Sequence, residues 1–247
     1  TVDVLQEEQS IPPVSPEDIW APSRKVASNY VRVGSESEKF IFYRGLGRFS
    51  VPIQVRTDSG TLKIKNDSDE AIADAFLIRY DGKLGSVKAL GGLPAHAESD
   101  FGTIGQGHAL VIDRYLNIVS TTLKSALARS GLYPDEAQAM VSTWSKSYFK
   151  TPGIRVLYVL PRKWTDRILP IQLSPTPSVI VRTLMGRVEI MTQDEELSLV
   201  KELKNVPLSS VKERLGRFTE PKLLRVKQIT KDAMINKKAD QILQSIN

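Results

Sequence analysis

Two arginines and a tyrosine beside a glycine turn are the first residues whose types could do chemistry. Arg44 and Arg48 stand on either side of the turn-forming letters GLG, and Tyr43 comes directly before Arg44. Guanidinium groups placed in this way can hold a carboxylate or a phosphate through paired hydrogen bonds. The glycines and aromatics around them also suit a strand that enters a tight turn and fills a core. The stretch therefore predicts either a binding site for an anionic group at Tyr43, Arg44 and Arg48 or, with more weight, a structural turn.

Two carboxylates in the second half of the chain are candidates for acid/base chemistry. Asp166 lies in RKWTDRILP and Glu189 in GRVEIM, and the sequence does not place them near each other. A pair of carboxylates at a suitable distance can serve as general acid and base. The alternative, which has more weight, is ion pairing with Arg162, Arg167 or Arg187.

Other catalytic and cofactor patterns are scarce. The chain has no cysteine and two histidines, which excludes disulfides and thiolate metal sites. The glycine-rich FGTIGQGHAL matches neither the dinucleotide nor the P-loop pattern, and no G-x-S-x-G is present. We therefore assign no catalytic residue, no metal ligand and no cofactor, and the sequence favours a protein without enzymatic activity.

Charge and hydropathy limit the partners. The net charge is +6, and 41% of the residues are hydrophobic. The basic residues are spread along the chain, which does not favour nucleic acid but allows an acidic protein or an anionic lipid surface as partner. No apolar run reaches the roughly 20 residues of a membrane-spanning helix, so we expect no transmembrane segment.

The apolar spacing predicts an α+β protein. Short alternating runs before residue 100 indicate an antiparallel β-sandwich-like part, and helical spacing then indicates a hairpin of two helices. A second mixed α/β part and a C-terminal helix follow. In this part RKWTDR predicts a turn, ILPIQLSP a strand, and residues 178–191 a long strand with Gly186 as a candidate bulge. Capping boxes predict helices near 193–204 and 210–217.

Both ends of the chain have the character of docking elements. The start is rich in proline and is expected to lie extended, with Trp20 as an anchor, and the last helix combines basic residues with an apolar stripe. That helix is expected to dock on its own domain or on another subunit. The predicted partner contacts are Trp20, Lys231, Ile235, Ile242 and Ile246. The predicted divisions are an extended arm at 1–24, the β-sandwich-like part at 25–100, the α/β part with the helical hairpin at 101–218, and a basic amphipathic helix at 219–247.

Several stretches together resemble the C-terminal half of a group of uncharacterised bacterial exported proteins. They run in order over roughly residues 20–225 and read EKFIFYRGLGRF, GLYPDEAQAMVSTWSKSYF, IRVLYVLPRKWTDRILPIQLSPTP, VRTLMGRVEI and LGRFTEPKLLR. Longer members of this family carry an N-terminal half with a "HEWGTF"-type motif. The resemblance implies a periplasmic or other extracytoplasmic location, and it implies no activity or catalytic residue.

These observations lead to two functional expectations. The first is a non-catalytic exported subunit with a structural or interaction role in a cell-envelope assembly. Its partners would be other protein subunits, with the chain's own N-terminal half as a separate chain among the candidates, and contact with a membrane surface stays open. The alternative is an envelope hydrolase or a binder of a small anionic ligand, with its site at the junction of the sheet and the helical hairpin.

Overall fold

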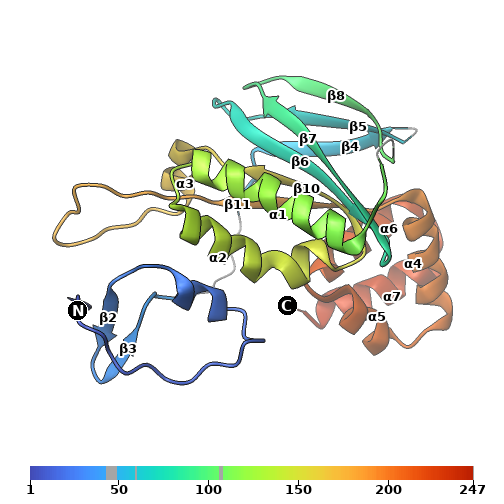
Figure 1. Ribbon diagram of the computed structural model, residues 1–247. Helices are drawn as coiled ribbons and strands as arrows, with labels where there is room; N and C mark the ends of the chain where they lie inside the picture. Colours follow the sequence, from blue (N-terminus) through green and yellow to red (C-terminus); the bar gives the residue numbers. More distant parts are fainter. Residues whose placement is uncertain (43–48, 59, 106–107, 247) are drawn as a thin grey trace. The chain divides into compact units, whose positions relative to one another are not determined.

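The computed structural model describes the chain except for residues 43–48, 59, 106–107 and 247. Contacts divide it into two compact units, Thr1–Glu189 and Ile190–Asn247. The first unit combines antiparallel sheets with helices, and the second is helical (Figure 1). The predicted α+β class with a helical C-terminal region is confirmed. The boundary between the units does not coincide with the sequence-based divisions at residues 24, 100 and 218.

The largest sheet of the first unit joins strands from both sides of residue 100. Its order is β11-β10-β6-β7-β9, and β6 pairs antiparallel with both β7 and β10. Its strands are β6 (Ile72–Tyr80), β7 (Leu84–Leu93), β9 (Leu110–Val111), β10 (Gly153–Val159) and β11 (Met185–Ile190). The predicted β and α/β parts therefore share one sheet, because the central strand comes from the first part and its neighbour β10 from the second.

Two smaller sheets complete the β structure of this unit. The order β4-β5-β8 joins Ile53–Asp58, Thr61–Asn66 and Glu98–Thr103. In β5 the predicted alternation is confirmed, because Leu62 and Ile64 are fully buried. The third sheet, β1-β2-β3, joins Asp3–Leu5, Tyr30–Val33 and Glu36–Glu38. Part of the predicted extended arm is thus paired, since β1 lies antiparallel to β2.

The predicted helical hairpin is confirmed. The helices are α1 (Ile112–Arg129) and α2 (Pro134–Trp144), and they lie beside each other in Figure 1. Gly131 after α1 has a φ of 109°, a conformation that glycine adopts readily, and Pro134 occupies the first turn of α2. Buried residues of α1 recur at helical spacing and share a core with β6 and β10. They are Tyr115, Val119, Leu123, Ala126 and Leu127.

Aromatic rings cover two strand glycines in this unit. Tyr115 of α1 lies against Gly85 of β7 and stacks on Tyr80, with 5.6 Å between the ring centroids. Tyr158 of β10 covers Gly186 of β11 in the same way. This contact explains why position 186, the candidate bulge, is a glycine, since a larger residue would overlap the tyrosine ring.

The segment between β10 and β11 differs most from its prediction. RKWTDR is not a turn but belongs to the helix α3 (Arg162–Ile168). The strand predicted from ILPIQLSP is not formed, and the run predicted from residue 178 becomes a strand only at Met185–Ile190. The described residues between α3 and β11 form neither a helix nor a strand.

The described residues of the second unit form four α-helices, whose apolar faces form its core. They are α4 (Gln193–Asn205), α5 (Leu208–Leu215), α6 (Thr219–Ile229) and α7 (Ala233–Gln244). The capping box at Thr192 and Glu195 is confirmed, whereas the one expected at Ser210 is not, because α5 starts earlier, after Pro207. The single C-terminal helix that was predicted is instead two helices, α6 and α7, since Asp232 caps the start of α7.

Replacing Asp232 by alanine tests its role as the N-cap of α7. Its carboxylate accepts hydrogen bonds from the backbone nitrogens of Ile235, at 3.3 Å, and Met234, at 3.0 Å, and the bond from Ile235 lowers the pKa of Asp232. Because the pKa of Asp232 is lowered in the folded state, its carboxylate stabilises the fold at pH values above the ordinary aspartate pKa of about 3.9. This stabilisation is lost as the pH falls through the lowered pKa. We expect Asp232→Ala to lower the thermal midpoint of helix unfolding at pH 7, and the difference from wild type to shrink at about pH 3.

Circular dichroism melts at the two pH values measure this effect. Asp194→Ala is the control, because Asp194 is exposed in the first turn of α4 and caps nothing in the described structure. An unchanged difference between wild type and Asp232→Ala at both pH values would contradict the assignment.

Candidate functional site

The predicted anion-binding residues lie outside the part of the chain that is described. Tyr43, Arg44 and Arg48 all fall within residues 43–48. On the near side of this gap, Phe42 is exposed, with its ring centroid 6.5 Å from that of Trp20. On the far side, the rings of Phe49 and Trp164 meet edge to face, with 5.7 Å between their centroids.

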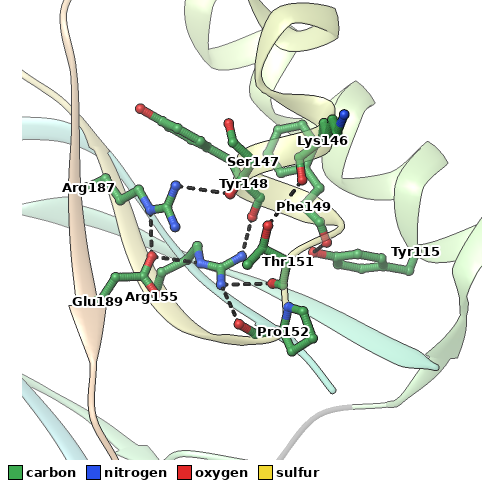
Figure 2. A network of polar contacts seen from close by, with 10 residues as sticks. All are labelled: Tyr115, Lys146, Ser147, Tyr148, Phe149, Thr151, Pro152, Arg155, Arg187 and Glu189. Carbon is green, nitrogen blue, oxygen red and sulfur yellow. Dashed lines mark hydrogen bonds and ion pairs between the residues drawn. The ribbon is translucent and has the colours of Figure 1, made fainter. Parts of the chain in front are cut away.

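A network of polar contacts lies at the end of α2 and joins Arg155, Arg187 and Glu189. After Trp144 the helix continues as a π-helical turn, Ser145–Phe149, in which Lys150 N donates to Ser145 O at 3.1 Å. Such turns are rare and occur frequently at functional sites. The turn leaves a row of carbonyl groups without helical partners, and Figure 2 shows which side chains reach them.

Four consecutive carbonyls of this turn each accept a hydrogen bond from a side chain. Thr151 Oγ1 donates to Lys146 O at 3.2 Å, and Arg187 Nη1 donates to Ser147 O at 3.0 Å. The other two bonds run from Arg155 to Tyr148 O and from the Tyr115 hydroxyl to Phe149 O (Figure 2). Two of the four donors are cations at a helix C-terminus, where the helix dipole favours positive charge.

Arg155 connects this turn to the sheet. Its side chain is fully buried, and its Nε donates to Glu189 Oε1 at 2.9 Å. Besides Tyr148 O, its guanidinium reaches Thr151 O at 2.9 Å and Pro152 O at 3.2 Å. Burying a charge without partners is very costly, and Arg155 avoids that cost through these bonds.

Glu189 and Arg187 complete the network. Arg187 Nε donates to the same Glu189 oxygen that receives Arg155, and its guanidinium lies 4.5 Å from the centroid of the Tyr148 ring. The Tyr148 ring stacks in turn on the Trp144 ring, with 5.3 Å between their centroids. Burial lowers the pKa of Arg187, and the neighbouring Glu189 opposes that shift. One carboxylate thus holds two guanidinium groups, each of which also caps the turn.

We call this arrangement a clamp, because its side chains hold the π-helical turn against the sheet. The groups of Arg155 and Glu189 face one another and the backbone, so Glu189 is occupied as an acceptor and is not presented as a base. The predicted ion pairing is confirmed for both carboxylates, since Glu189 pairs with Arg187 and Asp166 with Arg162. The hydrogen bond from Arg162 lowers the pKa of Asp166.

Two arginines of these ion pairs, Arg155 and Arg182, were missed by the sequence analysis. For Arg155 a signal exists in IRVLYVL, because alternation places it on the same face of β10 as Leu157, which is buried in the core. A charged residue at an inward-facing strand position needs buried partners.

Comparisons with protein-family models, curated proteins and solved structures gave no match for this chain.

The described residues contain no group of three or more histidine, aspartate or glutamate side chains arranged to hold a metal ion. His96 pairs with Asp69 at 3.0 Å in an exposed position, and His108 is also exposed. Burial raises the pKa of Tyr115 and of Tyr158 to about 12, so both hydroxyls stay protonated at neutral pH. No described helix is long and apolar enough to cross a bilayer.

The predicted partner contacts fall into two groups. Trp20, Lys231 and Ile246 are exposed. Ile235 and Ile242 are buried in the core of the second unit, so α7 docks on its own unit through these two residues. This is the first of the two arrangements that the amphipathic pattern left open.

Among the described residues, exposed large apolar side chains are frequent in two segments of the chain. Nine of them belong to the first 51 residues: Val2, Val4, Ile19, Trp20, Val33, Ile41, Phe42, Phe49 and Val51. Four more, Ile171, Leu173, Val179 and Val181, lie in the segment 169–184, which we call the apolar arm. In Figure 1 this arm is the long gold loop that leaves the end of α3 and returns to β11. Both of its limbs were predicted to be strands, and neither was predicted to be a site.

Proposed function

We propose that this chain is a non-catalytic exported subunit with a structural or interaction role in a cell-envelope assembly. The observation that carries the proposal is the concentration of exposed large apolar side chains in the first 51 residues. Apolar side chains exposed together, rather than singly, are typical of surfaces that bind other proteins or membranes. The partners would be other protein subunits.

The state of the charged groups supports a role without catalysis. Arg155, Arg187 and Glu189 hold one another and a helix end, and Asp166 is held by Arg162 and Arg182. A hydrolase or an anion-binding protein needs such groups turned toward a ligand. The resemblance to exported bacterial proteins is the ground for proposing an extracytoplasmic location.

Native mass spectrometry on the chain purified from its source cells, after cell fractionation, tests the proposal. We expect the chain in the envelope fraction and in a complex of fixed mass with one or more protein subunits. The double variant Val4→Ser/Trp20→Ser should lose that complex, because it removes two exposed apolar side chains of the first 51 residues. Leu224→Ser, at an exposed position of α6, is the matched control and should keep it.

Two results would overturn the proposal. One is a free monomer that carries a small-molecule adduct, which would favour the anionic-ligand alternative at Tyr43, Arg44 and Arg48. The other is a chain found in the cytoplasm without any protein partner.

A further inference from the structure

The apolar arm is unusual in composition. Residues 170–181 contain no charged side chain, although 25% of the chain is charged. Leu173 is 49% exposed and Val179 is 76% exposed. Every residue from Pro170 to Thr176 is exposed, so this limb does not pack one face on its own protein. Exposed apolar segments of this kind are typical of surfaces that bind another protein or a membrane.

The backbone of the arm is also without partners. Among the described residues, 170–179 form no backbone hydrogen bond, although ILPIQLSP and the run from 178 have strand-like apolar patterns. Three of these ten residues are prolines, which lack an N–H group and restrict the backbone. The arm therefore has fewer backbone donors to satisfy than an ordinary loop, and it loses less conformational entropy when it is ordered.

The base of the arm is fastened to the first unit. Arg182 donates to Asp166 at 2.8 Å and to Leu169 O at 2.5 Å. Arg162 donates to Ile180 O at 2.5 Å. The two limbs are thus tied together where they leave and rejoin the protein, which presents residues 170–179 as one preformed element.

Two basic residues of α3 lie at the base of the apolar arm. Lys163 and Arg167 are exposed, and they share one face of α3 because they are four residues apart. Neither forms an ion pair within the described part of the chain, whereas Arg162 and Arg182 are paired with Asp166. An uncharged apolar projection with positive charge behind it matches the layered chemistry of an anionic membrane surface.

We propose that the apolar arm inserts into the interfacial layer of a membrane that contains anionic lipids, with Lys163 and Arg167 at the level of the headgroups. A lipid surface fits better than a protein groove, because every residue of the limb from Pro170 to Thr176 is exposed and none offers a charged group for specific recognition. Insertion stays shallow, about 5–10 Å, since backbone groups without partners are costly in the hydrocarbon core. The inference rests on the proposed envelope role, for which it supplies a membrane contact.

Vesicle flotation with the purified chain tests the binding. We expect the wild type to float with vesicles of equal parts phosphatidylglycerol and phosphatidylcholine, and far less with phosphatidylcholine alone. The double variant Ile171→Ser/Leu173→Ser should reduce the partition coefficient roughly tenfold or more, and Lys163→Gln/Arg167→Gln should reduce binding to the anionic vesicles alone. Two controls should leave binding unchanged: Leu224→Ser, and Lys231→Gln/Lys237→Gln in the basic C-terminal region.

A fluorescent label reports insertion directly. Because the chain has no cysteine, Leu173→Cys can carry a single environment-sensitive dye, with Leu224→Cys as its counterpart on α6. We expect a blue shift and a rise in emission at position 173 when anionic vesicles are added, and none at position 224. Circular dichroism melts verify that each variant is folded.

Several outcomes would overturn the inference. They are the absence of flotation, an unchanged partition coefficient for Ile171→Ser/Leu173→Ser, and a loss of binding caused by Lys231→Gln/Lys237→Gln instead. A label at position 173 that responds to protein concentration but not to vesicles would identify a second copy of the chain as the occupant. In these cases the envelope role stands if the complex with other subunits is found. Vesicle binding by a chain that is cytoplasmic in its source would refute the envelope role and leave the inference intact.

Discussion

Arg155→Ala is expected to destabilise the first unit by about 3–5 kcal/mol, because it breaks a buried ion pair from one side. The substitution leaves Glu189 with one cation and removes the donors to Tyr148 O, Thr151 O and Pro152 O. The partly buried carbonyls that lose their donors add to the loss. Urea denaturation followed by tryptophan fluorescence measures the effect, since the three tryptophans all precede residue 190 and report only on this unit.

A matched variant separates the buried arginine from an ordinary surface ion pair. Arg56→Ala removes the partner of Glu98 at a position where the arginine side chain is 61% exposed, and it should change stability by less than about 1 kcal/mol. The double variant Arg155→Ala/Glu189→Ala should lose less than the sum of its single variants, because the two groups interact directly. A cost for Arg155→Ala as small as that for Arg56→Ala would show that the network is not a clamp.

Gly85→Ala is the second change with a large expected effect. A Cβ atom at this position of β7 would overlap ring atoms of Tyr115, which is fully buried and stacked on Tyr80. The ring cannot move away without disturbing the core, so we expect a loss of about 1–3 kcal/mol in the free energy of unfolding. The same argument applies to Gly186 beneath Tyr158.

Gly92→Ala in the same strand is the control for this prediction. A Cβ atom there would lie 3.5 Å from Ile72 O, which is ordinary contact, so stability should change by less than about 1 kcal/mol. The same urea denaturation measures all three glycine variants. Equal effects at positions 85 and 92 would mean that the loss comes from glycine's backbone freedom and not from the tyrosine.

Local sequence patterns correctly predicted the elements whose geometry and end signals depend only on nearby residues. The helical hairpin follows from the spacing of Tyr115, Val119 and Leu123 together with Gly131 and Pro134, since helix geometry and its end signals are local. The alternation in β5 is another case, because Leu62 and Ile64 reveal the buried face directly. Ion pairing of Glu189 and Asp166 was also predicted, since arginines stand close to both in the sequence.

The predictions were wrong where a strand-like pattern lacked a neighbour. ILPIQLSP and the residues from 178 have strand propensity, but a strand forms only when another strand supplies hydrogen bonds, and the described chain supplies no backbone hydrogen bond to residues 170–179. The break between α6 and α7 was missed for a simpler reason. The predicted helix was based on the stripe of Ile235, Ala239 and Ile242, which lies wholly within α7, and the cap at Asp232 shows where this helix begins.

The amino-acid sequence by itself determined the α+β class, the helical hairpin, the absence of cysteine chemistry and the moderately basic charge, because each depends on composition or on residues a few positions apart. Only the tertiary structure decided that strands from both sides of residue 100 share a sheet, and that Arg155 of β10 and Glu189 of β11 close a π-helical turn. It also decided that the apolar arm stays uncovered. These features depend on residues far apart in the chain, whose proximity comes from packing and from the need to pair buried charge.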